Sequence, residues 1–132
     1  MKYTSTSTIY IVDDDDAVRD SMRALLESHG LTVREYSSAH RFLDDEEPHG
    51  RDGFPRCLLL DLHMPGMGGA ELLERLKEKG SFIPVIVLTG RADVPLRERV
   101  VRAGARVLLE KPVDHDDLMR EITLSLADKA AD

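Results

Sequence analysis

Short apolar runs alternate along the chain with longer stretches in which apolar residues recur every three or four positions. The runs cover residues 9–12, 31–36, 57–60, 83–88 and 106–109. Most are rich in β-branched residues or leucine, which is typical of strands buried on both faces of a parallel sheet. The stretches between them have the periodicity of amphipathic helices. The pattern therefore predicts five strands alternating with five helices.

Capping residues indicate where these helices begin and end. The expected N-caps are Asp16, Ser38, Asp93 and Asp114, and the expected ends lie at Gly30, Gly80 and Gly104. Alternating strands and helices imply a doubly wound α/β fold, a parallel sheet with helices on both faces and right-handed crossovers. One domain is predicted over residues 8–127. Residues 1–7 are expected to be a flexible tail, and residues 128–132 a C-terminal tail or the start of a linker.

Composition narrows the classes of protein that fit. The chain has 132 residues, 42% hydrophobic and 33% charged, which suits one folded domain. A net charge of −7 argues against direct binding to nucleic acid or to an anionic membrane. No signal peptide or membrane-length apolar run is visible, so a cytoplasmic location is expected. The single cysteine, Cys57, is expected to be a small core residue.

Chemically active side chains follow the predicted strands. Four aspartates, residues 13–16, follow the first strand, Asp61 the third, Thr89 the fourth, and Lys111 the fifth. Taken singly, an aspartate at the end of a strand is usually a turn or capping residue. A threonine at such a position is usually a strand former, and a lysine is usually a solvated charge. In open α/β sheets, however, ligands bind beyond the carboxyl ends of the strands. The sequence therefore predicts one site at this edge of the sheet.

The residue types in this site suit phosphoryl transfer. Carboxylates crowded together repel one another, and oxygen ligands of this kind favour Mg²⁺. A carboxylate can also be the covalent nucleophile and form an acyl phosphate. A lysine ammonium can pair with phosphoryl oxygens, and a threonine hydroxyl can donate to them.

Four stretches resemble a known family. They are residues 11–15 (IVDDD), 60–69 (LDLHMPGMGG), 87–90 (VLTG) and 110–112 (EKP). In this order, one at each strand end, they resemble the receiver domain of two-component response regulators, from about Thr8 to about Ala127. Residues 93–96 and 102–105 resemble the FixJ-type subgroup in particular, whose members usually carry a C-terminal helix-turn-helix domain.

The resemblance implies the fold and the metal site. The fold would be flavodoxin-like, with strand order 2-1-3-4-5. Asp61 matches the phosphorylated aspartate. Asp14 matches the direct Mg²⁺ ligand and Asp13 its partner, with Asp61 and the backbone carbonyl of His63 completing the metal shell. Mn²⁺ is an alternative to Mg²⁺.

The resemblance also assigns roles around the phosphoryl group. Thr89 matches the switch hydroxyl and Lys111 the lysine that pairs with the phosphoryl oxygens. The bond between Lys111 and Pro112 is expected to be cis. Of the remaining aspartates, Asp15 is expected to be solvated or to lie behind the ligands, and Asp16 to cap the helix.

Two positions depart from the family pattern. Leu108 stands where the family usually has an aromatic residue, whose movement is coupled to that of the Thr89 position. Whether a leucine supports this coupling is left open by the sequence. Arg91 and the residue after it replace the His-Gly typical of FixJ-type chains. Arg91 lies two residues after Thr89, as His63 does after Asp61, so both positions could tune hydrolysis of the acyl phosphate.

The expected partner is a sensor histidine kinase or a histidine phosphotransfer protein. The resemblance also implies an output face formed by the fourth helix, fifth strand and fifth helix, so a homodimer through this face is a further expectation. The charged residues on it are either part of such an interface or an ordinary helix surface; they are Arg97, Glu98, Arg99, Arg102 and Arg106. The domain would not be an enzyme, catalysing only its own phosphorylation and dephosphorylation. One alternative is a binding module that takes no phosphate. Another is an aspartyl phosphatase, which commonly has a second aspartate where His63 stands.

Overall fold

The computed structural model describes residues 7–45, 48 and 55–127. Five strands have the bounds β1 Thr8–Val12, β2 Thr32–Tyr36, β3 Arg56–Asp61, β4 Val85–Thr89 and β5 Val107–Glu110. The helices are α1 Asp16–Ser28, α2 Ala39–Asp44, α3 Gly69–Glu78, α4 Val94–Arg102 and α5 His115–Ala127.

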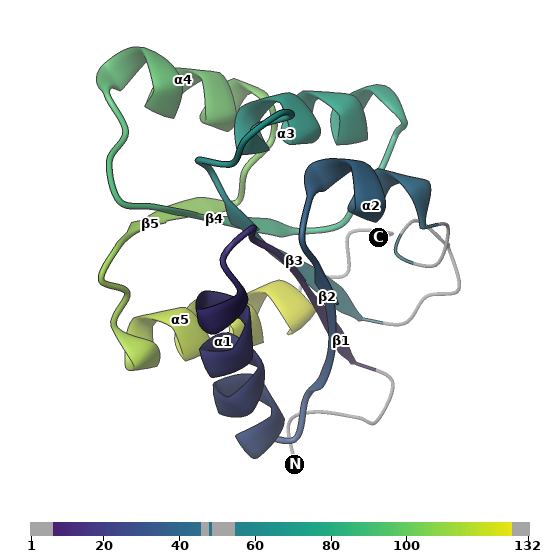
Figure 1. The fold of residues 1–132 in the computed structure, drawn as a ribbon, viewed down its shortest axis with the longest axis vertical. Coiled ribbons are helices and arrows are strands. Elements are labelled where there is room, and N and C mark those ends of the chain that lie inside the picture. Colours follow the sequence, from purple (N-terminus) through teal and green to yellow (C-terminus); the bar gives the residue numbers. More distant parts are fainter. Residues whose placement is uncertain (1–6, 46–47, 49–54, 128–132) are drawn as a thin grey trace.

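The strands form one parallel sheet in the order β2-β1-β3-β4-β5. The helices α2, α3 and α4 lie on one side of the sheet, and α1 and α5 lie on the other (Figure 1). The predicted doubly wound α/β fold and its strand order are therefore confirmed.

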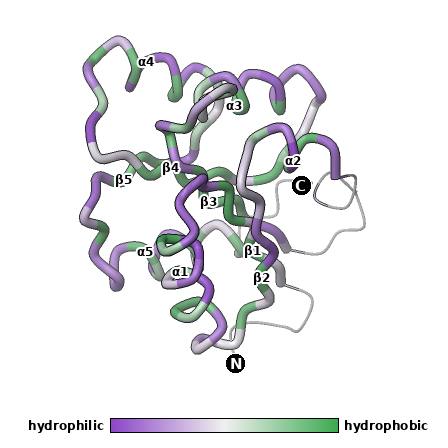
Figure 2. The backbone as a smooth tube through the Cα atoms, viewed as in Figure 1, coloured by the Kyte–Doolittle hydropathy of each residue, from purple (hydrophilic) through white to green (hydrophobic). Residues whose placement is uncertain are grey.

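Alternation along the strands divides the core into two layers. Tyr10, Leu58 and Val87 point toward α2, α3 and α4, whereas Ile9 and Leu59 point toward α1 and α5. All are almost fully buried. The central strands carry the hydrophobic colour along most of their length in Figure 2. Since both faces are covered, these strands need apolar residues at every position, which explains their continuous apolar runs.

One predicted helix cap is wrong. Helix α1 is capped by Asp15, whose carboxylate accepts hydrogen bonds from the N–H groups of Ala17 and Val18. Asp15 has extended backbone angles, as an N-cap requires, while Asp16 already lies in the first helical turn. The other three predicted caps, Ser38, Asp93 and Asp114, each accept from a backbone N–H of the first turn and are confirmed.

Strand boundaries differ from the predicted ones by one or two residues. The strand β4 begins at Val85 because Pro84 has no N–H to donate, although its carbonyl accepts from Leu58. Ser7, expected in the tail, is buried, and its carbonyl accepts a hydrogen bond from Thr32. The rest of the expected N-terminal tail, the C-terminal tail and most of the loop before β3 lie outside the described residues.

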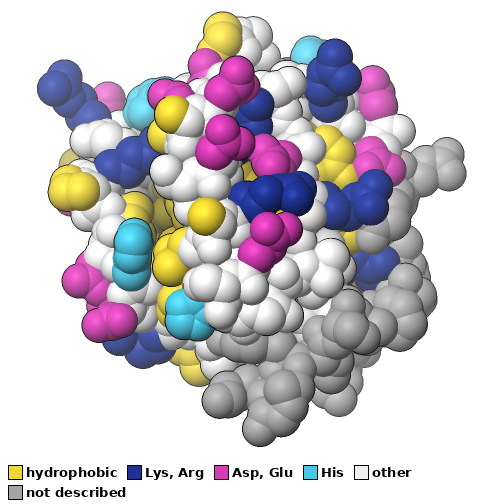
Figure 3. Space-filling model, turned by 60° about the horizontal axis from the view of Figure 1, so that its bottom comes forward, with side chains coloured by type: hydrophobic (Ala, Val, Ile, Leu, Met, Phe, Trp, Pro, Cys, Tyr) yellow, Lys and Arg dark blue, Asp and Glu magenta, His cyan; other side chains and the backbone are white. Residues whose placement is uncertain are grey.

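The surface is mixed in character. Acidic, basic and apolar side chains are interspersed across the face that Figure 3 brings forward, rather than gathered by kind. Among the described helices, none combines the length and the apolar character needed to cross a membrane.

Candidate functional site

Strand register brings the predicted site residues to one edge of the sheet. Val12 of β1 pairs with Leu60 of β3, so the next residues, Asp13 after β1 and Asp61 at the end of β3, lie side by side. In the same way Thr89 at the end of β4 pairs with Glu110 of β5. Parallel pairing thus brings these groups together at the carboxyl edge of the sheet, although up to about a hundred residues separate them along the chain.

Three carboxylates converge at this edge. Oxygens of Asp13, Asp14 and Asp61 all lie within 4.8 Å of one another. Asp13 is only 3% exposed and Asp61 6%, whereas Asp14 is exposed. Desolvation by burial raises the pKa of Asp13, and the neighbouring charge of Asp61 raises it further, although the Asp15 N–H and Lys111 oppose this.

The donor set of this cluster fits a divalent cation. Three carboxylates, two of them buried, put more negative charge in the pocket than the ammonium of Lys111 balances. Hard oxygen ligands on a half-open rim suit Mg²⁺, which keeps several waters when it binds. Asp13, Asp14 and Asp61 are the side chains that would hold it.

Lys111 closes the other side of Asp61. Its Nζ lies 3.3 Å from Asp61 Oδ1, and its backbone N–H donates to the Thr89 carbonyl at 2.8 Å. The bond between Lys111 and Pro112 is cis, as predicted. The predicted neighbours of Asp61, the two acidic residues and the lysine, are thus all found around it.

Thr89 lies at the same edge, with its hydroxyl engaged elsewhere. The residue is fully buried, and its Oγ1 donates to the carbonyl of Arg91 at 2.8 Å while accepting from the Arg91 N–H at 3.1 Å. The same carbonyl lies 2.6 Å from Nε2 of His63, which must donate because a carbonyl only accepts. His63 therefore links the loop after β3 to the loop after β4. Its own carbonyl as a metal ligand stays a prediction.

The two departures from the family pattern occupy different environments. Leu108 is half-buried and packs against the core layer under α3 and α4. Arg91 is exposed and contributes its backbone groups to the contacts with Thr89 and His63. Cys57 is fully buried, as predicted, and burial raises the pKa of its thiol to about 12.

A glycine lets α3 approach the strand that carries Asp61. A Cβ at Gly69 would lie 2.8 Å from the Asp61 carbonyl oxygen and 2.9 Å from Cα of Leu62. The Gly69 N–H donates to the Leu62 carbonyl at 3.1 Å. The start of α3 therefore fixes the backbone on which Asp61 stands.

Sequence reasoning missed Arg19 of α1. Its Nη1 donates to the carbonyl of Asp13 at 2.6 Å, directly behind the acidic cluster, and its Nε donates to Glu35 of β2 at 3.2 Å. No local signal marks it, because an arginine on an amphipathic helix is ordinary and its partner Glu35 is distant along the chain.

Comparison with known proteins is consistent with this geometry. The family described as the response regulator receiver domain matches residues 9–123. The transcriptional regulatory protein FixJ of Azorhizobium caulinodans is 43% identical over 122 residues, covering 92% of this chain and 56% of FixJ. FixJ of Bradyrhizobium diazoefficiens is 41% identical over 130 residues, covering 97% of this chain and 62% of that protein. The chain thus spans little more than half the length of these relatives.

Solved structures agree in fold. Full-length FixJ from B. japonicum superposes with a TM-score of 0.81 at 40% identity, covering 94% of this chain and 59% of that one. A CheY-like receiver domain from Methanospirillum hungatei superposes with a TM-score of 0.82 at 30% identity, covering 95% and 97% of the two chains.

Proposed function

The chain belongs to the response regulator receiver family, as a phosphoacceptor receiver of the FixJ type, and on this premise we propose that Asp61 takes the phosphoryl group. Receiver domains of two-component systems accept phosphoryl groups from histidine kinases. We propose that a sensor histidine kinase or a histidine phosphotransfer protein is the donor here. The observation that carries the assignment is the placement of Asp61 between two acidic residues on one side and Lys111 on the other.

The proposed reaction follows from these neighbours. A carboxylate oxygen of Asp61 attacks the phosphorus atom, an O–P bond forms, and the P–N bond to the donor histidine breaks. The bonding electrons go to the imidazole nitrogen. Lys111, with its ammonium beside Asp61, pairs with the phosphoryl oxygens. Burial of Asp61 excludes most water from the carboxylate that becomes the acyl phosphate.

Receiver domains bind Mg²⁺ at an acidic pocket, and we propose that Asp13, Asp14 and Asp61 hold it here, joined by the His63 carbonyl. Bound Mg²⁺, or Mn²⁺ in its place, would neutralise the negative charge that carboxylate and phosphoryl oxygens bring together.

Thr89 is the proposed switch residue. Its hydroxyl now donates to the Arg91 carbonyl, so reaching a phosphoryl oxygen requires that this hydrogen bond break. His63 keeps a hydrogen bond to the same carbonyl, which lowers the cost of releasing Thr89. Leu108, packed in the same core layer as α3 and α4, would transmit the movement in place of an aromatic residue.

We further propose that phosphorylation drives homodimerisation through α4, β5 and α5. Arginines expected to bind a partner already make contacts within the chain, Arg99 to both oxygens of Glu74 at 2.8 Å and Arg97 to Glu110. The apolar Val94 and Val101 of α4 are instead 64% and 67% exposed. Seven residues apart, they lie on one stripe of the helix.

The wider assignments are also proposals. The domain would not act as an enzyme on a separate substrate, and it would not bind nucleic acid itself, given its net charge of −7. A cytoplasmic location is proposed because the relatives are transcriptional regulatory proteins, which act where the chromosome is.

Intact-mass analysis after incubation with Mg²⁺ and acetyl phosphate tests the function. We expect a gain of one phosphoryl group, absent in Asp61→Asn and absent without a divalent cation. A wild-type chain that gains no phosphoryl group from acetyl phosphate or from a histidine kinase would instead be a phosphate-independent binding module. Steady turnover of phosphate esters would indicate a phosphatase.

A further inference from the structure

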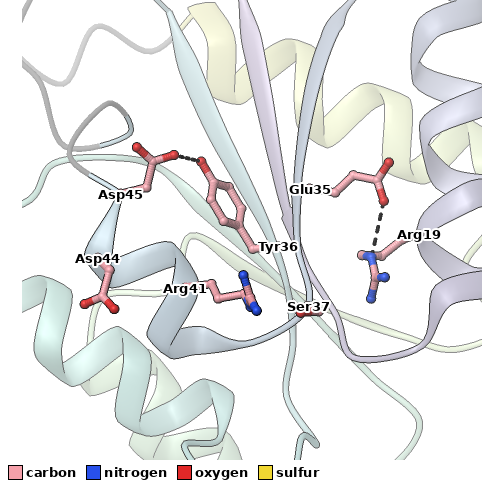
Figure 4. A pocket seen from close by; sticks show the side chains of 7 residues that line it. All are labelled: Arg19, Glu35, Tyr36, Ser37, Arg41, Asp44 and Asp45. Carbon is pink, nitrogen blue, oxygen red and sulfur yellow. Dashed lines mark hydrogen bonds and ion pairs between the residues drawn. The ribbon is translucent and has the colours of Figure 1, made fainter.

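The turn that presents two of the acidic residues is held by Arg19. The guanidinium donates through Nη1 to the Asp13 carbonyl at 2.6 Å, through Nε to Glu35 at 3.2 Å, and through Nη2 to Asp16. The side chain is only 13% exposed. Figure 4 shows Arg19 paired with Glu35 along one side of an open hollow of about 640 Å³ beside β2.

The Asp13 carbonyl controls where the next carboxylate points. A peptide unit is planar, so a carbonyl held in one direction also fixes the N–H of Asp14 and the start of that residue. The other polar groups of Asp13 are held as well. Its N–H donates to Tyr36 of β2 at 3.2 Å, and its carboxylate accepts from the N–H of Asp15 at 2.9 Å. Only Arg19 among these contacts fixes the peptide that joins Asp13 to Asp14.

The shape of the guanidinium matters more here than its charge. Arg19 donates hydrogen bonds to a backbone carbonyl and to two acidic residues that lie outside the three-carboxylate cluster. One planar group therefore bridges three acceptors, which lie on β2, on the turn and on α1. A lysine at this position would retain the charge but could not span the three acceptors in that fixed geometry.

We propose that Arg19 is a positioning residue for the divalent cation, which sets the affinity of the acidic pocket by fixing the turn between Asp13 and Asp14. The inference rests on the proposed function, since it concerns the same cation site. Groups that orient the residues binding a metal typically change its affinity 10–100-fold when they are removed. Arg19 acts on binding of the cation and leaves the attack by Asp61 unchanged once the cation is bound.

Arg23 offers a matched control. It lies one turn further along α1, donates to the same Glu35 carboxylate, and also donates to the Val33 carbonyl at 3.1 Å. It contacts β2 and Glu27 of its own helix, away from the Asp13 turn. Replacing Arg23 therefore removes contacts between α1 and β2, including one to the same Glu35, without releasing the Asp13 carbonyl.

The direct experiment measures cation binding without phosphorylation. Metal-stripped wild-type, R19K, R19A and R23K proteins are titrated with Mn²⁺, and free Mn²⁺ is followed by electron paramagnetic resonance. We expect R19K and R19A to bind about tenfold more weakly than wild type. R23K is expected to stay within about twofold. Urea unfolding identifies the variants that fold, and if R19A does not, R19K against R23K decides the question.

A second readout separates positioning from chemistry. Autophosphorylation by acetyl phosphate is measured against Mg²⁺ concentration. For R19K the half-saturating Mg²⁺ should rise about tenfold while the rate at saturation stays within about twofold. The inference is overturned if R19K binds Mn²⁺ as wild type does, if R23K weakens binding as much as R19K, or if only the saturated rate falls. A wild-type chain that binds Mn²⁺ but cannot be phosphorylated would defeat the proposed function alone.

Discussion

At the scale of single residues, the site places like charges together in a buried position. Asp13 and Asp61 are both nearly inaccessible, and Asp14 adds a third carboxylate at the rim. Lys111 offsets part of this charge. The folded chain therefore carries a local electrostatic cost that a bound cation would remove, so stability should depend on both metal and pH.

Asp13→Asn should stabilise the metal-free protein. Because the pKa of Asp13 is raised in the folded state, ionisation of its carboxyl destabilises the folded protein. This destabilisation is absent below the ordinary pKa of 3.8 and grows as the pH rises through the folded-state pKa. The asparagine oxygen can still accept from the Asp15 N–H. We expect a gain in the free energy of unfolding on the order of 1 kcal/mol at pH 7, shrinking toward pH 3, in urea unfolding with a chelator present.

The same variant tests the metal site. Saturating Mg²⁺ should raise the melting temperature of the wild-type protein and leave that of Asp13→Asn nearly unchanged, because a ligand stabilises only the state that binds it. Equal stabilisation of both proteins by Mg²⁺ would count against Asp13 as a ligand.

At the scale of elements, the ends of helices decide how the site is built. Helix α1 starts at a cap inside the run of four aspartates, and α3 starts in contact with the backbone of Asp61. At each junction, one substitution should lower stability more than a control substitution at another position.

Asp15→Ala should cost about 1 kcal/mol of stability, because two N–H groups of α1 lose their acceptor. Asp16→Ala should cost no more than about 0.5 kcal/mol, since that residue is exposed and only pairs with Arg19 on the surface of the helix. Urea unfolding of the two variants measures the difference. The reverse order of effects would restore Asp16 as the cap.

Gly69→Ala should destabilise the protein by about 2 kcal/mol and slow phosphorylation, since the new methyl group meets the backbone of Asp61 and Leu62. Gly90→Ala is the control, because a Cβ there meets nothing within 4 Å. Its stability should change by no more than about 0.5 kcal/mol. Denaturant unfolding and the acetyl phosphate reaction provide the two measurements, and equal losses in both variants would refute the steric explanation.

At the scale of the whole molecule, the sheet joins the candidate site to the proposed dimer face. Thr89 ends β4 directly before the loop into α4, and Lys111 begins the loop from β5 to α5. A movement of Thr89 away from the Arg91 carbonyl therefore acts on the segment that leads into α4. The exposed Val94 and Val101 lie on that helix.

Sedimentation with beryllofluoride and Mg²⁺ should reveal a dimer that is absent without the phosphoryl mimic. Val101→Asp should abolish it, because a charge would be buried in the apolar stripe of the interface. Phe82→Ser is the control, since Phe82 is 63% exposed but lies in the segment before β4, outside α4, β5 and α5. A wild-type protein that stays monomeric with beryllofluoride contradicts the dimer proposal.

The sequence predicted the fold well because the signals for it are local. Each buried strand needs apolar side chains on both faces, and each helix needs one apolar stripe, so the five elements of each kind can be read from spacing alone. Parallel pairing then requires that Asp13, Asp61, Thr89 and Lys111 meet at one edge. Their relative placement was therefore predictable without coordinates.

Tertiary structure decided what depends on backbone direction and on distant contacts. Four consecutive aspartates are alike in sequence, and only their backbone angles select Asp15 as the cap and leave Asp13 buried. The hydroxyl of Thr89 turns to the Arg91 carbonyl, and Arg19 reaches both Glu35 and the Asp13 carbonyl. The sequence by itself thus determined which groups share the site, because the carboxyl ends of parallel strands lie along one edge of the sheet, whereas the strand order was implied only by the family resemblance. Only the folded chain determined which donors satisfy which acceptors, because that choice depends on angles and distances that sequence spacing does not contain.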